Sequence, residues 1–172
     1  MRARTMVLMA LAGVVAAGSI RAQDLQRPRA GSFNIGVGSF NMGHSKSSAG
    51  VGLEYRLDSR AWTPRQGGRF SLIPVLGMTA SSKNALFGYA GLRSDLNVTR
   101  NWRLTPGFAV GIYARNGDIN LGGPMEFRSS LDISRSLNRR GTRAGVTLYH
   151  ISNARLYDRN PGVNALAFVQ TY

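Results

Sequence analysis

The sequence predicts an all-β protein, an eight-stranded antiparallel transmembrane β-barrel of the outer-membrane type. Three observations lead to this class. Apolar residues recur at every second position in many segments, which is the period of a β-strand. The alternate positions carry glycine, small polar residues and charges, as expected for a face that points into a narrow lumen. After residue 22, no segment has the run of about 20 apolar residues that a spanning helix needs.

Eight segments are expected as strands, and each is about long enough to cross a bilayer at a tilt. Eight is an even number, as in bacterial single-chain barrels. Pro74 and Pro106 fall inside the third and fifth segments, where proline is unusual and indicates a bulge. The expected strands cover residues 31–42, 48–58, 69–81, 84–98, 102–115, 124–137, 143–153 and 162–172.

Three of these segments show the alternation most clearly. The second places residues 49, 51, 53, 55 and 57, all apolar or aromatic, on one face. The fifth does the same with residues 102, 104, 106, 108, 110 and 112. The sixth opposes an apolar row to Glu126, Arg128 and Asp132, which share the other face and are expected to form ion pairs in the lumen. The last segment ends at an aromatic residue, Tyr172, as outer-membrane barrels commonly do. A soluble lipocalin-like barrel, with its apolar face turned inward, is the structural alternative.

Residues 1–22 are arranged like a secretory signal peptide. Arg2 and Arg4 supply positive charge, an apolar run follows, and small residues lead to a cleavage site after Ala22. Residues 23–172 then form a single barrel domain. Export together with a transmembrane barrel predicts the bacterial outer membrane as the location.

The composition excludes several kinds of site. The chain has no cysteine, so it has neither disulfides nor a thiolate centre. It has only two histidines, His44 and His150, which excludes a His-rich metal site, and no metal-ligand spacing is present. His44 lies in a Gly/Ser-rich turn and is interpreted as a solvated residue.

The chain is strongly basic, with 22 Lys and Arg against 8 Asp and Glu and a formal net charge of +14. All but Lys46 and Lys83 of the basic residues are arginine, whose planar fork binds phosphate and carboxylate. Nucleic acid is the usual partner of such charge, but export and the scattered arginines argue against it. An anionic, phosphorylated lipid surface fits better, and a simple compositional bias toward arginine is the alternative.

The seventh segment carries the residues best suited to catalysis. His150 and Ser152 continue the apolar row of Ala144, Val146 and Leu148, so they project from the same face of the strand. An imidazole beside a hydroxyl is the minimum set for an activated nucleophile. In a membrane barrel this row faces lipid, which indicates a lipid substrate.

The C-terminal third resembles the outer-membrane lipid A 3-O-deacylase family. The resemblance rests on three pieces: Leu121-Gly-Gly-Pro-Met-Glu-Phe-Arg128, His150-Ile-Ser-Asn-Ala154 and Asn160-Pro-Gly162. It implies an eight-stranded barrel whose catalytic residues lie on the outer surface. It also implies hydrolysis of a primary acyl ester of lipopolysaccharide, with no cofactor, and with lipid A and outer-membrane lipid as partners. The sequence predicts no particular oligomeric state.

The resemblance also implies roles for individual residues. Ser152 falls on the family's nucleophile and His150 on its general base, while Asn153 and Asn160 are candidates for holding an oxyanion. Asn164 stands where the family's described triad has a glutamate that orients the histidine. Asp158 in the preceding loop is an alternative source of that acid, and Arg155 departs from the glycine usual after the alanine.

Two functions of other classes remain open at this point. A non-catalytic barrel with a structural or adhesive role would use His150 and Ser152 only as rim residues. A periplasmic carrier of an amphiphile would use the lipocalin-like arrangement. For Asn153 and Asn160 the alternative is turn formation, because Asn-Pro-Gly is a good turn sequence.

Overall fold

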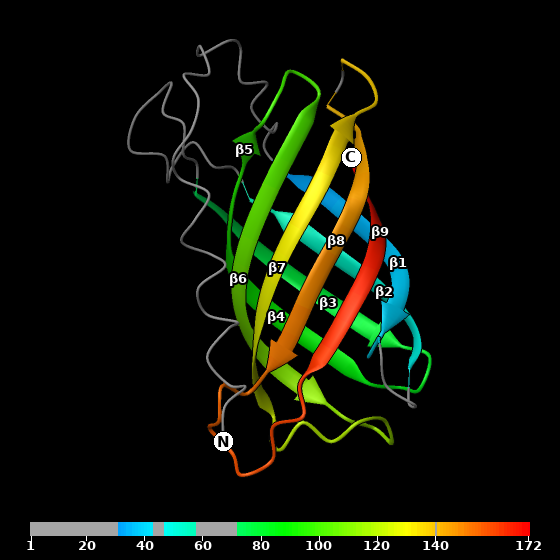
Figure 1. Ribbon diagram of the computed structural model, residues 1–172, viewed down its shortest axis with the longest axis vertical. Helices are drawn as coiled ribbons and strands as arrows, with labels where there is room; N and C mark the ends of the chain where they lie inside the picture. Colours follow the sequence, from blue (N-terminus) through cyan, green and yellow to red (C-terminus); the bar gives the residue numbers. More distant parts are fainter. Residues whose placement is uncertain (1–30, 43–46, 58–71, 140) are drawn as a thin grey trace, which may run out of the picture.

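A computed structural model describes residues 31–42, 47–57, 72–139 and 141–172 of the chain (Figure 1). The expected signal peptide, His44 and parts of the second and third expected strands lie outside these ranges. The strands are β1 (Ser32–Phe40), β2 (Ser48–Arg56), β3 (Leu72–Ser81), β4 (Leu86–Ser94), β5 (Leu96–Asn97), β6 (Trp102–Ala114), β7 (Met125–Ser136), β8 (Arg143–Ser152) and β9 (Val163–Thr171).

These strands form one closed antiparallel sheet. The hydrogen-bonded order is β4-β3-β2-β1-β9-β8-β7-β6-β5, and pairing of β4 with β6 closes the barrel. Both β4 and β5 pair with β6, so they are the two parts of a single wall strand. The predicted eight-stranded barrel is therefore confirmed. Within the described ranges, no helix is long and apolar enough to cross a membrane.

The irregularity in the wall lies opposite one of the two prolines. Register is continuous around Pro74, so the bulge expected there is wrong. The ladder on β6 stops after the pair of Arg93 with Gly107 and resumes at the pair of Leu96 with Leu104, so the interruption between β4 and β5 faces Pro106. Both parts keep the same register, so the wall has a gap in its ladder there and not the inserted residue of a bulge. Pro106 has no N–H to donate to the ladder.

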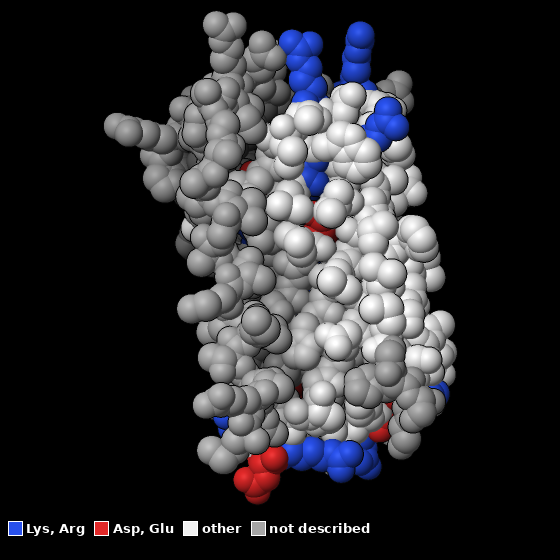
Figure 2. Space-filling model, in the orientation of Figure 1, with Lys and Arg blue, Asp and Glu red and all other residues white. Residues whose placement is uncertain are grey.

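The two faces of the sheet are segregated as the alternation predicted, with the apolar face outward. Val51 and Leu53 on β2, and Phe108 and Ile112 on β6, are 43–61 % exposed. Residues that alternate with them, such as Glu54, Ala109 and Tyr113, point inward and are buried. Figure 2 shows Lys and Arg gathered at both ends of one face of the molecule, with mostly uncharged surface between them. A soluble protein does not expose an apolar belt of this kind, so the lipocalin-like alternative is wrong.

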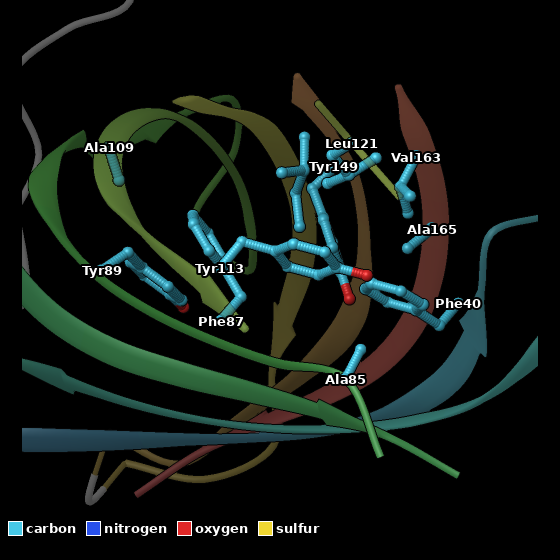
Figure 3. Packing of buried hydrophobic residues seen from close by; sticks show 11 residues of the cluster. Phe40, Ala85, Phe87, Tyr89, Ala109, Tyr113, Leu121, Tyr149, Val163 and Ala165 are labelled. Atoms are coloured by element: carbon cyan, nitrogen blue, oxygen red, sulfur yellow. The ribbon is translucent and has the colours of Figure 1, made fainter. Parts of the chain in front are cut away.

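One half of the lumen is filled by apolar and aromatic side chains. They gather at the end where the β6–β7 and β8–β9 loops lie, which we call the loop end (Figure 3). Tyr149, Ile151, Val163 and Ala165 line the inner side of β8 and β9 there, and each is at least nine-tenths buried. This packing gives the wall behind His150 and Ser152 a solid support.

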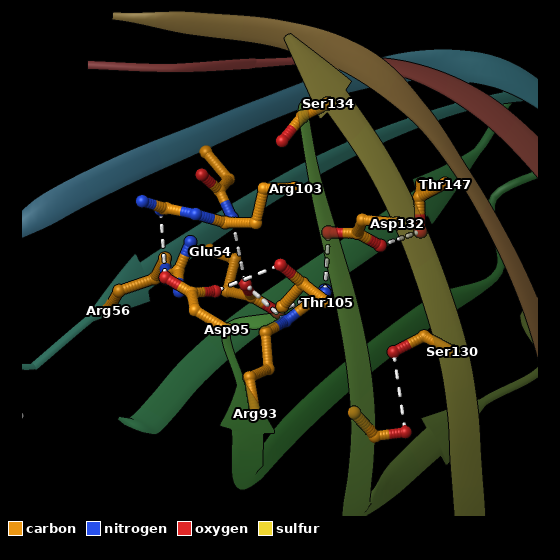
Figure 4. A network of polar contacts seen from close by, with 12 residues as sticks. Glu54, Arg56, Arg93, Asp95, Arg103, Thr105, Ser130, Asp132, Ser134 and Thr147 are labelled. Carbon is orange, nitrogen blue, oxygen red and sulfur yellow. Dashed lines mark hydrogen bonds and ion pairs between the residues drawn. The ribbon is translucent and has the colours of Figure 1, made fainter. Parts of the chain in front are cut away.

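The other half of the lumen is filled by a network of ion pairs (Figure 4). The guanidinium of Arg93 donates to Asp132 at 2.6 Å and to Glu54 at 2.9 Å. Such charges are stable inside a barrel because each has a partner of opposite sign. A second centre is Asp95, which accepts from Arg56 at 2.6 Å, Arg103 at 2.8 Å and Thr105 at 2.9 Å.

Glu126, Arg128 and Asp132 of β7 share the lumen, as expected, but they do not pair with one another. Asp132 bonds to Arg93, and the guanidinium of Arg128 lies over the rings of Tyr89 and Tyr149, 4.9 and 4.4 Å from their centroids. The carboxylate of Glu126 is fully buried and hydrogen-bonds to none of the residues that the structure describes.

Candidate active site

The outer face of β8 carries the two residues expected to do chemistry. Tyr149 and Ile151 are buried in the lumen, at 7 % and 0 % exposure, while Leu148 in the alternate row is 50 % exposed. His150 and Ser152 belong to the row of Leu148 and are partly exposed. Both side chains therefore lie on the outer surface of the barrel wall, close to the loop end of β8.

Register with β9 places a third polar residue beside the imidazole. Asn164 is the cross-strand partner of His150, and its Oδ1 lies 2.8 Å from His150 Nδ1. Asn164 is exposed on the same outer surface. Among the described residues, the contact to Nδ1 comes from Asn164 and not from Asp158, which is exposed in the β8–β9 loop.

Gly162, directly before β9, supports the other edge of the ring. A Cβ atom at this position would lie 2.7 Å from Cε1 and 3.2 Å from Nε2 of His150, so the imidazole rests against the glycine backbone. The φ angle of Gly162 is +68°, which also favours glycine. Asn164 and Gly162 together hold the ring, with Nδ1 at the amide oxygen and the Cε1–Nε2 edge against the glycine.

Ser152 is the last residue of β8, and its neighbour on β7 is Phe127. Within the described part of the chain, no hydrogen bond joins its hydroxyl to His150. Contacts between a nucleophile and its base are often long without substrate and shorten when substrate binds. Residues two apart on one strand face are close enough for a small adjustment of the two side chains to bring them together.

Asn153 anchors the loop that follows the serine. Its side chain is fully buried, its Nδ2 donates to the carbonyl oxygens of Leu121 and Arg159, and its Oδ1 accepts from Arg155 N at 2.9 Å. Both amide hydrogens are engaged, so this side chain has none left for an oxyanion. Asn153 instead ties the β6–β7 loop to the β8–β9 loop.

A tight turn begins at Asn153. The two residues after it, Ala154 and Arg155, have φ angles of +52° and +68°, and Leu156 N donates to Asn153 O at 2.9 Å. This is the arrangement of a type I′ turn, in which glycine is favoured at the second central position. Arg155 occupies that position, so the departure from glycine noted in the sequence falls where the backbone is left-handed.

Asn160 lies beside the backbone of Asn153, the residue that follows Ser152. Its Oδ1 accepts from Asn153 N at 3.3 Å, and the residue is partly exposed. The Nδ2 group donates to no other residue that the structure describes. An amide donor is therefore held next to the end of β8, close to the position of Ser152.

The site contains no set of metal ligands. In the described ranges, no three His, Cys, Asp or Glu side chains lie close enough to hold a metal ion. Ser152, His150, Asn164 and Asn160 supply a hydroxyl, an imidazole and two amides, which is a set suited to acyl transfer.

Comparison with known proteins gives the family. The family model described as lipid A 3-O-deacylase (PagL) matches residues 47–172, which is most of the chain. This chain belongs to that family. It is therefore an ester hydrolase of the outer membrane, a lipid A deacylase. The rival interpretation as a non-catalytic structural barrel is wrong.

Solved structures agree on the fold. The crystal structure of the outer membrane enzyme PagL matches with a TM-score of 0.60 at 20 % identity, covering 81 % of this chain and 97 % of that chain. A de novo designed transmembrane β-barrel matches with a TM-score of 0.54 at 9 % identity, covering 85 % of this chain and 98 % of that chain. No curated protein sequence matches this chain.

Proposed function

We propose that this lipid A deacylase is a serine esterase in which Ser152 is the nucleophile, His150 the general base and Asn164 the residue that orients the histidine. The observation that carries the proposal is the contact of 2.8 Å between His150 Nδ1 and Asn164 Oδ1 on the outer wall of the barrel. An oriented imidazole beside a serine, on the surface that meets lipid, is what hydrolysis of a membrane ester requires.

Asn164 sets the tautomer of the imidazole. When His150 Nδ1–H donates to Asn164 Oδ1, the lone pair of Nε2 is free to accept the serine proton. A glutamate would do the same and would also stabilise the imidazolium formed during the reaction. An amide orients but does not neutralise, so this chain is expected to be a slower enzyme than one with a carboxylate.

The reaction then follows the usual course of acyl transfer. Ser152 Oγ attacks the ester carbonyl carbon while His150 Nε2 takes its proton, and a tetrahedral intermediate forms. The proton passes from His150 to the leaving sugar oxygen, the carbon–oxygen bond breaks, and the acyl chain stays on Ser152. Water, activated by the same histidine, releases the fatty acid and restores the serine.

The negative oxygen of the intermediate needs donors, and Asn160 is the side chain placed to supply one. Its Oδ1 is held by Asn153 N, directly after the nucleophile, which leaves Nδ2 for the oxyanion. For Asn153 we propose a structural role instead of the expected oxyanion role, because its side chain is buried and fully bonded.

The surface on one side of Ser152 suits the acyl chain of a lipid substrate, and the surface on the other side suits its headgroup. Leu131, Leu148 and Leu166 form a cross-strand row of three exposed leucines on the side away from the loops. On the other side, the exposed Arg155 and Arg159 of the β8–β9 loop offer positive charge to phosphorylated sugar. The acyl chain is thus expected on the leucines, and the lipid A headgroup at the loops.

The test is deacylation of purified lipopolysaccharide in detergent, followed by mass spectrometry of lipid A. The wild-type protein is expected to remove one primary acyl chain, at the 3-position that the family description names. Ser152→Ala is expected to remove none, while Ser39→Ala, which changes an outward serine on β1, keeps the activity. Equal activity of Ser152→Ala and wild type would show that another group is the nucleophile.

A further inference from the structure

The end of the barrel opposite the loop end carries exposed positive charge. We call it the turn end, because the turns β5–β6 and β7–β8 lie there, at the top of Figure 1. Arg135 and Arg139 are exposed at this end, and Figure 2 shows Lys and Arg side chains there. Every described Asp and Glu is buried except Asp158, which lies at the loop end. Within the described ranges, the exposed charge of the turn end is therefore suited to an anionic partner.

One of these arginines projects from the wall of the barrel and not from a turn. Arg135 follows Ile133 in the outward row of β7, and its cross-strand neighbours are Trp102 on β6 and Ala144 on β8. Gln170 on β9 is the partner of Ala144 and continues the same row. Trp102, Arg135, Ala144 and Gln170 thus form a row across four strands on the lipid-facing surface.

Three side chains of this row are hydrogen-bond donors that the protein does not use. The guanidinium of Arg135, the indole N–H of Trp102 and the amide of Gln170 bond to none of the residues that the structure describes. Trp102 is 46 % exposed, and the other two are exposed or partly exposed. Such donors are unfavourable beside hydrocarbon unless a ligand accepts from them. A phosphate group does so, and its oxygens match the planar fork of arginine.

The depth of the row places it at a border of the membrane. Ala144 and Ser152 are eight residues apart on β8, which is about 26 Å along the strand and about 20 Å of depth at the usual tilt. The apolar band of an outer-membrane barrel is about 25 Å tall. If Ser152 lies near one border of this band, Arg135 lies near the other, where phospholipid phosphates are found. The longer β6–β7 and β8–β9 loops mark the loop end as the outer side, so this border is the periplasmic one.

The row also has room for a headgroup. Neighbouring strands lie about 4.8 Å apart, so the backbones of Arg135 and Gln170, on either side of β8, are about 10 Å apart. Ala144 between them has only a methyl side chain and leaves that space open. The next level toward the loop end is apolar and includes Val146 and its partner Phe168, which is 70 % exposed. An acyl chain can lie on this level while its phosphate meets the polar row.

We propose that Arg135, Trp102 and Gln170 form a binding site for an anionic glycerophospholipid of the periplasmic leaflet. The lipid phosphate accepts from the three side chains, and the positive charge of the turn end favours an anionic headgroup over a zwitterionic one. The bound lipid is not a substrate. It lies about 20 Å from the level of Ser152 and holds the barrel at a fixed depth. The inference does not depend on the proposed serine mechanism.

The experiment measures which lipid lies beside Trp102. In a Trp62→Phe background Trp102 is the sole tryptophan, so the fluorescence of the barrel reports on this row. The barrel is placed in phosphatidylcholine vesicles with increasing fractions of phosphatidylglycerol or phosphatidylcholine whose acyl chains carry bromine, which quenches tryptophan on contact. We expect about fivefold tighter binding of phosphatidylglycerol than of phosphatidylcholine. Arg135→Gln is expected to abolish this preference, and Gln170→Ala to weaken it.

Arg139→Gln is the matched control, because it removes the same charge from the same end but lies in the turn and outside the row. It is expected to keep most of the preference. Equal losses in Arg135→Gln and Arg139→Gln would show a general attraction of charge and overturn the site. A wild type without the preference would overturn it as well, because water would then satisfy the three donors. If Arg135→Gln does not fold, Gln170→Ala decides, and an unchanged preference in that variant contradicts the proposal.

Discussion

Replacing Asn164 by aspartate is expected to raise the rate of deacylation. Aspartate has the shape of asparagine, so its Oδ1 can keep the 2.8 Å contact with His150 Nδ1 while a negative charge is added beside the imidazole. That charge stabilises the imidazolium that forms when His150 takes the serine proton. The gain therefore appears in the transition state and raises kcat.

The size of the effect follows from the distance and the surroundings. Two unit charges about 4 Å apart attract by about 1 kcal/mol in water and about 4 kcal/mol near a protein surface. Because Asn164 is exposed, we take a value near 2 kcal/mol, which corresponds to an increase in kcat of about 30-fold. This gain in kcat is smaller than the loss in kcat of about four orders of magnitude that follows when asparagine replaces the aspartate of trypsin-like triads. In those triads the wrong tautomer of the histidine contributes to the loss. Here Asn164 Oδ1 already accepts from Nδ1.

The assay is the initial rate of fatty acid release from lipopolysaccharide by wild type, Asn164→Asp, Asn164→Glu and Asn164→Ala. Asn164→Ala, which removes the acceptor, is expected to lose at least tenfold in kcat. Thermal unfolding in detergent serves as the control, since a charge near the membrane interface costs only about 0–1 kcal/mol. Unchanged or lower activity of both acidic variants, with intact barrels, would refute the orienting role of Asn164.

Three further predictions concern the support of the site. Gly162→Ala places a Cβ 2.7 Å from Cε1 of His150 and displaces the ring. We expect kcat to fall by about 100-fold while the barrel stays folded. An unchanged kcat would contradict the packing of the ring on this glycine. Arg155→Gly relieves a left-handed φ of +68° and is expected to raise the free energy of unfolding by up to about 1 kcal/mol, whereas Arg159→Gly, where φ is not positive, is expected to lower it. Arg93→Met leaves two buried carboxylates without their guanidinium and is expected to cost about 3–5 kcal/mol in unfolding free energy. The folded fraction of that variant should retain its deacylation rate, because the ion pairs lie inside the wall and the site outside.

The alternation of the sequence was sufficient to predict the wall of the barrel and the side from which each residue projects. Periodicity of two is a local property, so it fixes the face of Ser152 and of Glu54 without knowledge of the fold. It could not predict the partners of Asp95. Arg56 and Arg103 come from other strands and meet this carboxylate only when the barrel closes.

The site was predictable in part for the same reason. The face shared by His150 and Ser152 follows from their spacing, whereas the position of Asn164 beside the imidazole depends on the register of β8 and β9, which the intervening loop sets. Only the family resemblance pointed to that residue. The support by Gly162 was hidden within an Asn-Pro-Gly sequence that reads as a turn.

Two other residues show that residue type alone does not predict what a side chain does. Asn153 has the chemistry of an oxyanion donor, but its amide is consumed by two carbonyl groups of the loops. Ser129 interrupts an apolar row by a single hydroxyl, and only the register of β7 and β8 shows that it lies opposite His150. In both cases long-range contacts decide what a side chain can do.

The most direct measurement is covalent labelling of the nucleophile by a fluorophosphonate that carries an acyl-like tail, with the modified residue identified by peptide mass spectrometry. The account predicts one label per chain, on Ser152, formed at a rate that falls strongly in His150→Ala and rises in Asn164→Asp. Labelling of a different residue, or equal labelling of wild type and His150→Ala, would contradict an activated serine on the outer wall of the barrel.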